Sequence, residues 1–319
     1  MTPGRTCPLH YRYPPSVFNR DADIRAETIY VIGGLYGNRS ALDAILALAA
    51  QEVIPPTLVF NGDFNWFNID TAGFKAVNDE VLKHAALRGN VETELAVDAD
   101  EAGCGCAYPD YVDDIDVERS NEIMRALRKT ARQFPGLSQA ASQLPMHAIA
   151  EVGGQRFGIV HGDAESLSGW RFAHDALHET ANIEWLKKVC GDARLAGFAS
   201  SHTCLPTFRR YTRAEVTVFV INNGAAGMPN FSHTQYGLIS RISIHPAQEG
   251  LAQYGAALNG VHIDALPVHY DHAQFTRDFL AQWPPGSPAH DSYFKRIVDG
   301  PAFASPHALG LIRAPSFCA

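Results

Sequence analysis

The chain has 319 residues, of which 46% are hydrophobic and 19% charged, and such values are typical of a globular protein that buries a large core. A formal net charge of −8 argues against nucleic acid as a partner, because non-specific binding to nucleic acid needs a basic surface. No apolar run reaches the roughly 18 residues of a membrane span, and residues 1–15 lack the apolar stretch of a signal peptide. We therefore expect a cytoplasmic protein with no membrane partner, and its oligomeric state stays open.

Strands and helices are predicted to alternate along the chain. Strands are expected at 28–33, 57–61, 85–88, 156–160, 195–199, 216–222 and 236–244. Helices are expected at 40–52, 71–83, 117–134 and 180–190, and WPPGSP (283–288) is expected to form a turn before a final short helix. Alternation of this kind indicates an α/β protein built from layered sheets and helices.

Four short polar signatures each follow directly on one of the apolar runs. They are Asn61-Gly62-Asp63 after TLVF, Arg88-Gly89-Asn90 after HAAL, His161-Gly162-Asp163 after FGIV, and Ser201-His202-Thr203 after AGFAS. An apolar run that ends in a turn is typical of a buried strand and its C-terminal loop, which is where ligands bind in open α/β sheets. The loops would present one carboxylate, one carboxamide and two imidazoles. This set of oxygen and nitrogen ligands suits Mn, Fe or Zn, so the sequence predicts a metal site.

The order of these signatures resembles that of calcineurin-like metallophosphoesterases, whose motifs run D-x-H-G-N, G-D, G-N-x-(D/E), H-G and G-H-T-H. The corresponding segments here are Gly34-Leu35-Tyr36-Gly37-Asn38, Gly62-Asp63, Gly89-Asn90-Val91-Glu92, His161-Gly162 and Ser201-His202-Thr203-Cys204. The segments INNGAAGMPN (221–230) and VHYDHAQF (268–275) resemble later elements of the family, so that the match covers about residues 28–275. The resemblance implies the four-layer α/β/β/α sandwich of the metallophosphoesterase type.

The departures from the family pattern fall on one of its two metals. The resemblance implies Asp63 as the bridging ligand and Asn90, His161 and His202 as the other ligands of the second metal, and all four are present. The positions that would hold the first metal carry Gly34, Tyr36 and Cys204 instead. Because every substitution falls on the same ligand set, we infer one divalent transition metal per chain, or a site whose first metal is held unusually, and the identity of the metal stays open.

The resemblance implies a metal-dependent phosphoesterase that hydrolyses a phosphomonoester or phosphodiester, so the expected partner is a small phosphorylated substrate. One metal activates water less strongly than two, and Val91 replaces the histidine often assigned as the acid for the leaving group. The alternative is a catalytically inactive binding or regulatory protein that keeps the fold and one metal. A surviving catalyst would need other groups beside Asp63, and Tyr36 and Cys204 are the candidates.

Several of these residues keep a second interpretation. Tyr36 is either a packed aromatic side chain or a contact of the metal or substrate, and Cys204 is either a small apolar replacement or a thiolate. Glu92 is either a partner in a loop salt bridge or an orienter of a ligand histidine. The i, i+4 spacing of His174 and His178 is typical of a helix face.

The six cysteines, at positions 7, 104, 106, 190, 204 and 318, form no Cys-x-x-Cys pair, so reduced thiols are expected and Cys104-Gly105-Cys106 is read as loop. We divide the chain into an N-terminal arm (1–27), a core (28–247) and a C-terminal extension packed on the core (248–319), with 301–319 as a loosely held tail. An insertion at about 92–120 is either a lid over the site or a surface excursion.

Overall fold

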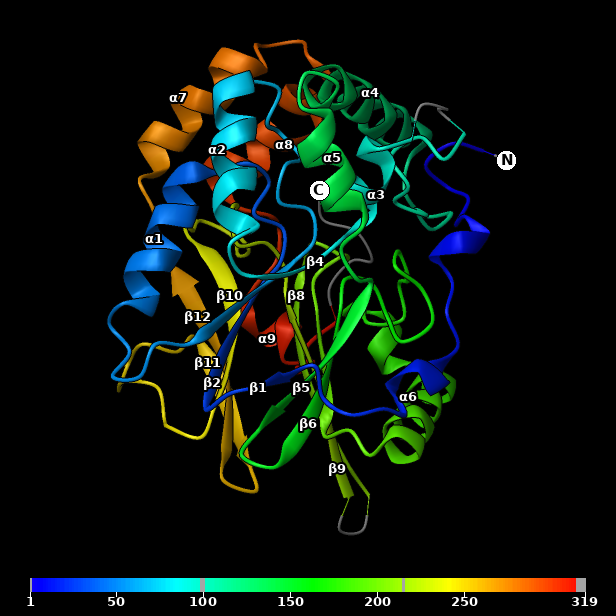
Figure 1. Cartoon of the computed structure of the whole chain (residues 1–319), viewed down its shortest axis with the longest axis vertical. Helices are drawn as coiled ribbons and strands as arrows, with labels where there is room; N and C mark the ends of the chain where they lie inside the picture. The colour runs from blue at the N-terminus through cyan, green and yellow to red at the C-terminus, as the bar shows by residue number, and fades with distance from the viewer. Residues whose placement is uncertain (1, 98–100, 214–215, 314–319) are drawn as a thin grey trace.

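The structure is a computed structural model that describes residues 2–97, 101–213 and 216–313. Two β-sheets pack face to face, and helices cover their outer faces and one end of the strands (Figure 1). The four layers are helix, sheet, sheet and helix, which confirms the predicted α/β/β/α sandwich. No helix among the described residues is long and apolar enough to cross a membrane.

Among the described residues, each sheet has six strands. The first sheet contains, in spatial order, β11 (Tyr254–Leu258), β12 (Val261–Val268), β10 (Gly237–Ser243), β2 (Thr28–Ile32), β3 (Thr57–Asn61) and β4 (Ala85–Leu87). The second contains β1 (Ile24–Arg25), β5 (His147–Val152), β6 (Gln155–Val160), β7 (Gly197–Ser200), β9 (Val216–Asn223) and β8 (Pro206–Arg213). Strands β2, β3 and β4 are parallel, as are β6, β7 and β9. Each parallel set therefore brings its C-terminal loops to one edge of its sheet.

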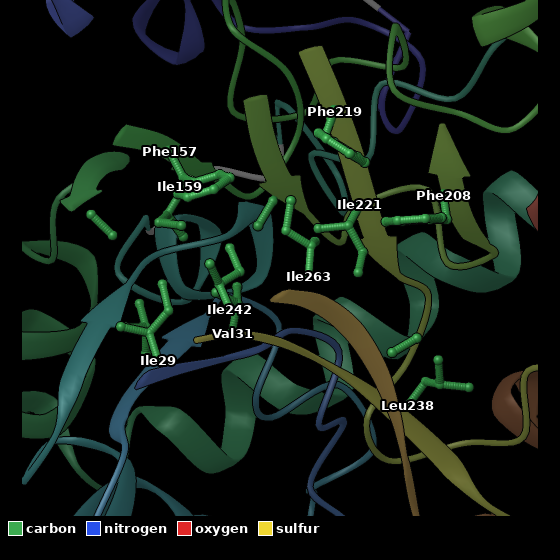
Figure 2. Close-up of a cluster of buried hydrophobic side chains, with 14 of the residues drawn as sticks. Ile29, Val31, Phe157, Ile159, Phe208, Phe219, Ile221, Leu238, Ile242 and Ile263 are labelled. Carbon is green, nitrogen blue, oxygen red and sulfur yellow. The ribbon is translucent and has the colours of Figure 1, made fainter. Parts of the chain in front are cut away.

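The main core lies between the two sheets. Strand β2 is buried along its whole length, and its side chains alternate between two environments because successive residues of a strand point to opposite faces. Ile29 and Val31 face the second sheet, whereas Tyr30 and Ile32 face the helices. Figure 2 shows the inter-sheet cluster in which Ile29 and Val31 belong with Phe157 of the opposite sheet. Burial on both faces explains why these strands read as continuous apolar runs.

Helices cover both outer faces and the strand ends that carry the site. The first sheet is covered by α1 (Arg39–Ala49) and α2 (Thr71–Val81), and the second by α6 (Thr180–Ala193). The helices gathered at the top of Figure 1 are α3 (Asn90–Leu95), α4 (Asp114–Ala131), α5 (Pro135–Ser142), α7 (His272–Gln282) and α8 (Pro288–Asp299). The shorter elements are α9 (Ser305–Ala308) and the 3-10 turns η1 (Leu9–Tyr11), η2 (Pro15–Phe18) and η3 (Ala176–His178).

All the predicted strands and helices are present, with ends shifted by a few residues. The strands β1, β5, β8, β11 and β12 were not predicted, nor were the helices α3, α5, α7 and α9. The prediction of a loosely held tail is wrong for residues 301–313, because Phe303 and Ala308 are buried. The rest of that segment lies outside the described residues. The division into arm, core and extension stays a prediction. Strand β1 from 1–27 pairs with β5 of the core, and β12 from 248–319 pairs with β10 of the core and with β11.

Candidate metal centre

Four predicted ligands meet where the two sheets abut. Asp63 follows β3, Asn90 begins α3 after β4, His161 follows β6 and His202 follows β7, and all four side chains are buried. The His161 Nε2 atom lies 3.1 Å from Asn90 Oδ1, 3.1 Å from His202 Nδ1 and 3.4 Å from Asp63 Oδ1. The ligand atoms of the carboxylate and the two imidazoles all lie within 4.8 Å of one another. The structure therefore brings together the whole set that the sequence predicts.

The outer nitrogens of both histidines are held by backbone carbonyls. His161 Nδ1 lies 2.9 Å from the carbonyl oxygen of Asn61, and His202 Nε2 lies 2.9 Å from that of Cys106. A carbonyl can only accept, so this network assigns the hydrogen to those outer nitrogens. The lone pairs of His161 Nε2 and His202 Nδ1 then point to the common centre. Hydrogen bonds of this kind orient the histidine ligands of metal sites.

The two oxygen ligands are held just as firmly. Asn90 Nδ2 donates to the carbonyl oxygen of Cys104 at 2.9 Å, which leaves Oδ1 facing the centre. The carboxylate of Glu92 accepts from the backbone N–H groups of Asp63 at 2.8 Å, Phe64 at 3.1 Å and Gly89 at 2.9 Å. Glu92 therefore orients the loop that carries Asp63, and neither of its two predicted roles is found. Burial and the nearby Asp63 charge raise the pKa of Glu92 to about 7.

The ligand cluster needs a positive charge. Four atoms with lone pairs face one another. Only a protonated histidine could place a hydrogen between them. Burial opposes a charge on His161, but the Asp63 carboxylate raises the pKa of His161 above its usual value. Burial and a charged His161 lower the pKa of His202 to about 3. The cluster thus accommodates one cation, and a divalent metal ion competes with the proton for the same lone pairs.

At the positions where the resemblance would place ligands of a first metal, the side chains contact one another and their neighbours. The hydroxyl of Tyr36 lies 3.1 Å from Cys204 Sγ, and the Tyr36 ring lies 5.8 Å from that of Phe67. A Cβ atom on Gly34 would lie 2.9 Å from the Tyr36 ring, so tyrosine occupies the space that an aspartate at position 34 would need. Burial raises the pKa of both Tyr36 and Cys204, which keeps the two groups neutral. This pair supplies no charged ligand.

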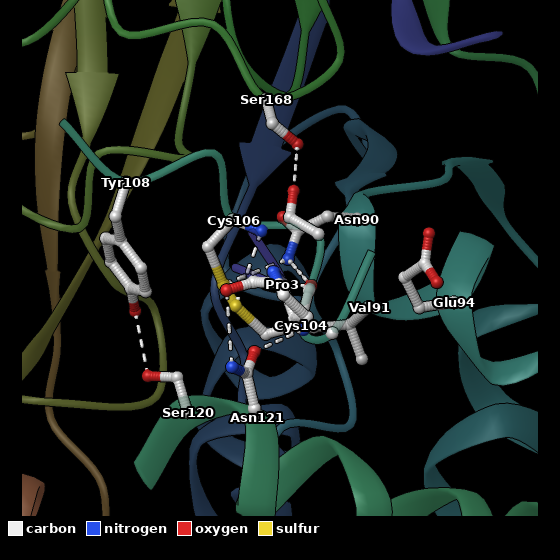
Figure 3. The surroundings of a disulfide bond; sticks show 12 residues. Pro3, Asn90, Val91, Glu94, Cys104, Cys106, Tyr108, Ser120, Asn121 and Ser168 are labelled. Carbon is white, nitrogen blue, oxygen red and sulfur yellow. Dashed lines mark hydrogen bonds between the residues drawn. A yellow bond between two sulfur atoms is a disulfide. The ribbon is translucent and has the colours of Figure 1, made fainter. Parts of the chain in front are cut away.

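The loop at 104–106 lies beside Asn90 (Figure 3), and the carbonyl of Cys106 contacts His202. Cys104 and Cys106 form a disulfide, so the expectation of reduced thiols is wrong for this pair. The carbonyls of Cys104 and Cys106 accept from Asn90 and His202, and that of Cys106 also accepts from Trp170 Nε1 at 3.1 Å. Ser168 Oγ donates to the carbonyl between them at 2.7 Å. This part of the 92–120 segment is therefore buried against the site and is no surface excursion.

A cleft of about 880 Å³, including space open to solvent, leads to the ligands. The cleft is lined by Asp63, Asn90, His202, Tyr36 and Cys204. It is also lined by five large aromatic residues and one arginine that the sequence analysis missed, which are Trp66, Tyr108, Tyr111, Trp170, Tyr293 and Arg296. These residues come from the loop between β3 and α2, the segment after α3, the loop before α6 and helix α8, and the family motifs cover none of them.

His174 also lines the cleft. It is buried and precedes η3, so its predicted place on a helix face is wrong. Its Nε2 atom has no hydrogen-bond partner among the described residues.

Comparison with known proteins agrees with this architecture. No model of a known protein family matches the chain, and no curated protein matches it either. Among solved structures, a metallophosphoesterase from Sphaerobacter thermophilus is similar at 15% identity and a TM-score of 0.55, over 86% of this chain and 99% of that one. A hypothetical protein from Pyrococcus horikoshii OT3 is similar at 14% identity and a TM-score of 0.57, over 86% and 98% of the two chains. The chain has the metallophosphoesterase fold, as the motif resemblance predicts.

The disulfide loop yields the first prediction. Replacing Cys104 and Cys106 together by serine removes the covalent closure of the loop whose carbonyls hold Asn90 and His202. Because such supporting hydrogen bonds are typically worth 10–100-fold, we expect metal affinity to fall by about 10-fold or more. Competition with a chelator of known affinity measures this, with Cys7→Ser, a half-buried thiol on another loop, as the control. An unchanged affinity in the double variant would contradict the role assigned to the loop.

The second prediction concerns the space at Gly34. Gly34→Asp places a side chain against the Tyr36 ring at a residue with φ of +63°, and we expect a loss of about 2–4 kcal/mol of unfolding free energy. Gly154→Asp is the matched control, because Gly154 has φ of +73° and no atom within 4 Å of an added Cβ. Adding Tyr36→His to Gly34→Asp should restore part of the loss. Urea unfolding in the presence of a chelator measures all three, and equal losses for the two aspartates would show that Tyr36 does not fill this space.

Proposed function

We propose that the protein is a metal-dependent phosphoesterase with one metal ion per chain, acting on a small phosphorylated substrate. The observation that carries the proposal is the convergence of one carboxylate, one carboxamide and two oriented imidazoles on a single point at the base of a cleft. The metallophosphoesterase fold of the chain supports the choice of reaction. The neutral Tyr36–Cys204 pair supports a single ion, because it leaves no charged ligand set beside the first.

Asp63, Asn90, His161 and His202 would hold the ion. Their donor set suits Mn, Fe or Zn, and the carbonyls that hold both imidazoles would keep the lone pairs aimed at the ion without rearrangement. When bound, such an ion polarises a phosphoryl oxygen and lowers the pKa of a bound water.

The surrounding side chains favour a phosphodiester with a good leaving group. Val91 is buried and apolar at the position where a leaving-group acid is expected, so it can donate no proton. A leaving group of low pKa, such as a phenolate, needs no such acid. The aromatic walls of the cleft suit a planar group, because aromatic rings stack on one another favourably. Tyr36 and Cys204, the candidates beside Asp63, are neutral. Cys204 Sγ donates to the carbonyl oxygen of His202 at 3.3 Å and contacts the Tyr36 hydroxyl, so either group would have to give up this contact to donate to substrate or water.

The second candidate function is a catalytically inactive binding or regulatory protein that keeps one metal. The packing of Tyr36 against Phe67 and Cys204 favours it, because the space of a second ion is occupied by side chains. The two candidates predict the same metal content and differ only in turnover.

The third prediction therefore joins metal content to turnover. Mass spectrometry of the purified protein should count close to one transition metal per chain, lost in His161→Ala. With added Mn the protein should slowly cleave bis(4-nitrophenyl) phosphate, and Asp63→Asn should lower the rate by about 100-fold or more, because it removes a charged ligand. The control is Asp43→Asn, which changes an exposed carboxylate on α1 and should leave the rate unchanged.

Each contrary outcome addresses a different part of the proposal. Two tightly bound ions would contradict the single-ion site. One ion with no turnover across a panel of monoesters and diesters would favour the binding protein. A protein that binds no transition metal would contradict both candidates.

A further inference from the structure

Arg296 is a buried guanidinium that faces the cleft. It lies in the last turns of α8, is 3% exposed and lines the cleft together with Tyr36, Asp63 and Cys204. Its Nε atom donates to the carbonyl oxygen of Pro229 at 3.2 Å, and Nη2 donates to that of Cys204 at 2.7 Å. Among the described residues, no acceptor lies within hydrogen-bonding distance of Nη1, and Nη1 is not sealed from solvent. At most two of the three nitrogens are therefore used.

The charge of Arg296 has no carboxylate beside it in the described part of the chain, although a guanidinium keeps its proton in proteins. Two other buried arginines, by contrast, have acidic partners. Arg128 lies 3.0 Å from Glu94, and Arg241 forms ion pairs with Glu52 and Asp264. A buried cation without an anion is unfavourable, so the position of Arg296 calls for a negatively charged ligand.

Arg209 shows what a purely structural buried arginine looks like in the same molecule. It has no carboxylate partner among the described residues either, and it does not line the cleft that leads to the candidate ligands. Its Nη1 and Nη2 atoms donate to the backbone carbonyls of His174, His307, Phe208 and Ala308. Both of its terminal nitrogens are thus used within the protein, whereas Nη1 of Arg296 has no hydrogen-bond partner in the described part of the chain.

Arg296 also lies on the side of the site where the first-metal ligands are missing. Its Nη2 atom donates to the backbone of Cys204, the residue whose thiol contacts the hydroxyl of Tyr36. Burial raises the pKa of the Cys204 thiol, and the positive charge of Arg296 partly offsets that effect, as expected for a close neighbour. The cleft thus has ligands for one cation at Asp63, Asn90, His161 and His202 and a fixed positive charge beside the Tyr36–Cys204 pair.

We propose that Arg296 binds the substrate's phosphoryl group, with the free Nη1 group donating to a non-bridging oxygen on the Tyr36–Cys204 side of the cleft. Arg296 thereby supplies, from α8, positive charge where a dinuclear site would have a second ion. The ligand class is a tetrahedral oxyanion, and guanidinium groups suit it because their N–H groups diverge in a fixed plane. The identity of the substrate rests on the proposed function, but binding of the oxyanion does not require turnover.

Isothermal titration of the Mn-loaded protein with inorganic phosphate tests the proposal. Arg296→Gln should weaken phosphate binding by about 10–100-fold, because a hydrogen bond from a charged group is lost. Arg296→Lys keeps the charge without the planar geometry and should bind with intermediate affinity. Arg209→Gln removes a comparably buried guanidinium away from the cleft, and phosphate affinity should stay within about twofold of the parent. Metal content and unfolding midpoint are measured for every variant.

A folded, metal-loaded Arg296→Gln protein that binds phosphate as tightly as the parent would overturn the proposal, as would a metal-loaded parent that binds no phosphate. If Arg296→Gln does not fold, Arg296→Lys tests the proposal instead, since lysine can still donate to the carbonyl of Cys204. A phosphate affinity of Arg296→Lys equal to that of the parent would also overturn the proposal. Arg296-dependent phosphate binding without turnover of any ester supports this inference and contradicts only the hydrolase. Turnover of bis(4-nitrophenyl) phosphate by Arg296→Gln with the parent's kcat/KM overturns this inference and leaves the hydrolase intact.

Discussion

Two sheets come close enough at one edge for four loops to place their electron-pair donors around a single point, and the rest of the site depends on this approach. Asn61 is the link between the sheets, because its Nδ2 atom donates to the carbonyl of Val160 at 2.7 Å, and its own carbonyl accepts from Ser201 Oγ at 2.9 Å. That same carbonyl holds the ring of His161. Gly33 allows the approach, since a Cβ atom there would lie 2.1 Å from the Cβ of Ser201. The same contacts therefore pack the two sheets together and orient the candidate ligands.

The two halves of the site differ in electrostatics. On one side, buried acceptor atoms face one another, and the outer nitrogens of His161, His202 and Asn90 contact backbone carbonyls. On the other side, a neutral tyrosine–cysteine pair adjoins the fixed charge of Arg296. A negatively charged group in the cleft would lie between a metal ion and a guanidinium, which is an arrangement that stabilises charge in phosphoryl transfer. With a metal ion bound at the four candidate ligands, the cleft would hold two positive centres of different chemical kinds.

The sequence predicts the fold well, and the four predicted ligand residues do lie together, because both rest on local patterns; that these residues bind a metal stays a prediction. Buried parallel strands appear as short apolar runs, and polar residues at their ends are the ones that meet at a sheet edge, which is why Asp63 and His161 could be identified. Strands such as β11 were missed because only their pairing with β12 makes them strands. Arg296 could not be found either, since it is one charged residue on an amphipathic helix and only the packing of α8 against the cleft distinguishes it. The role of Cys104 and Cys106 could not be predicted either, because it belongs to their backbone carbonyls, whose positions the identities of the side chains do not specify.

The central claim is that one ion occupies the point between the four loops and that no second ion occupies the Tyr36–Cys204 side. Anomalous diffraction from a crystal of the Mn-loaded protein, recorded on both sides of the manganese absorption edge, tests it most directly. The account predicts one manganese peak in contact with Asp63, Asn90, His161 and His202. A second peak of comparable height about 3.5–4 Å away, beside Tyr36 and Cys204, would contradict it and would indicate a dinuclear centre.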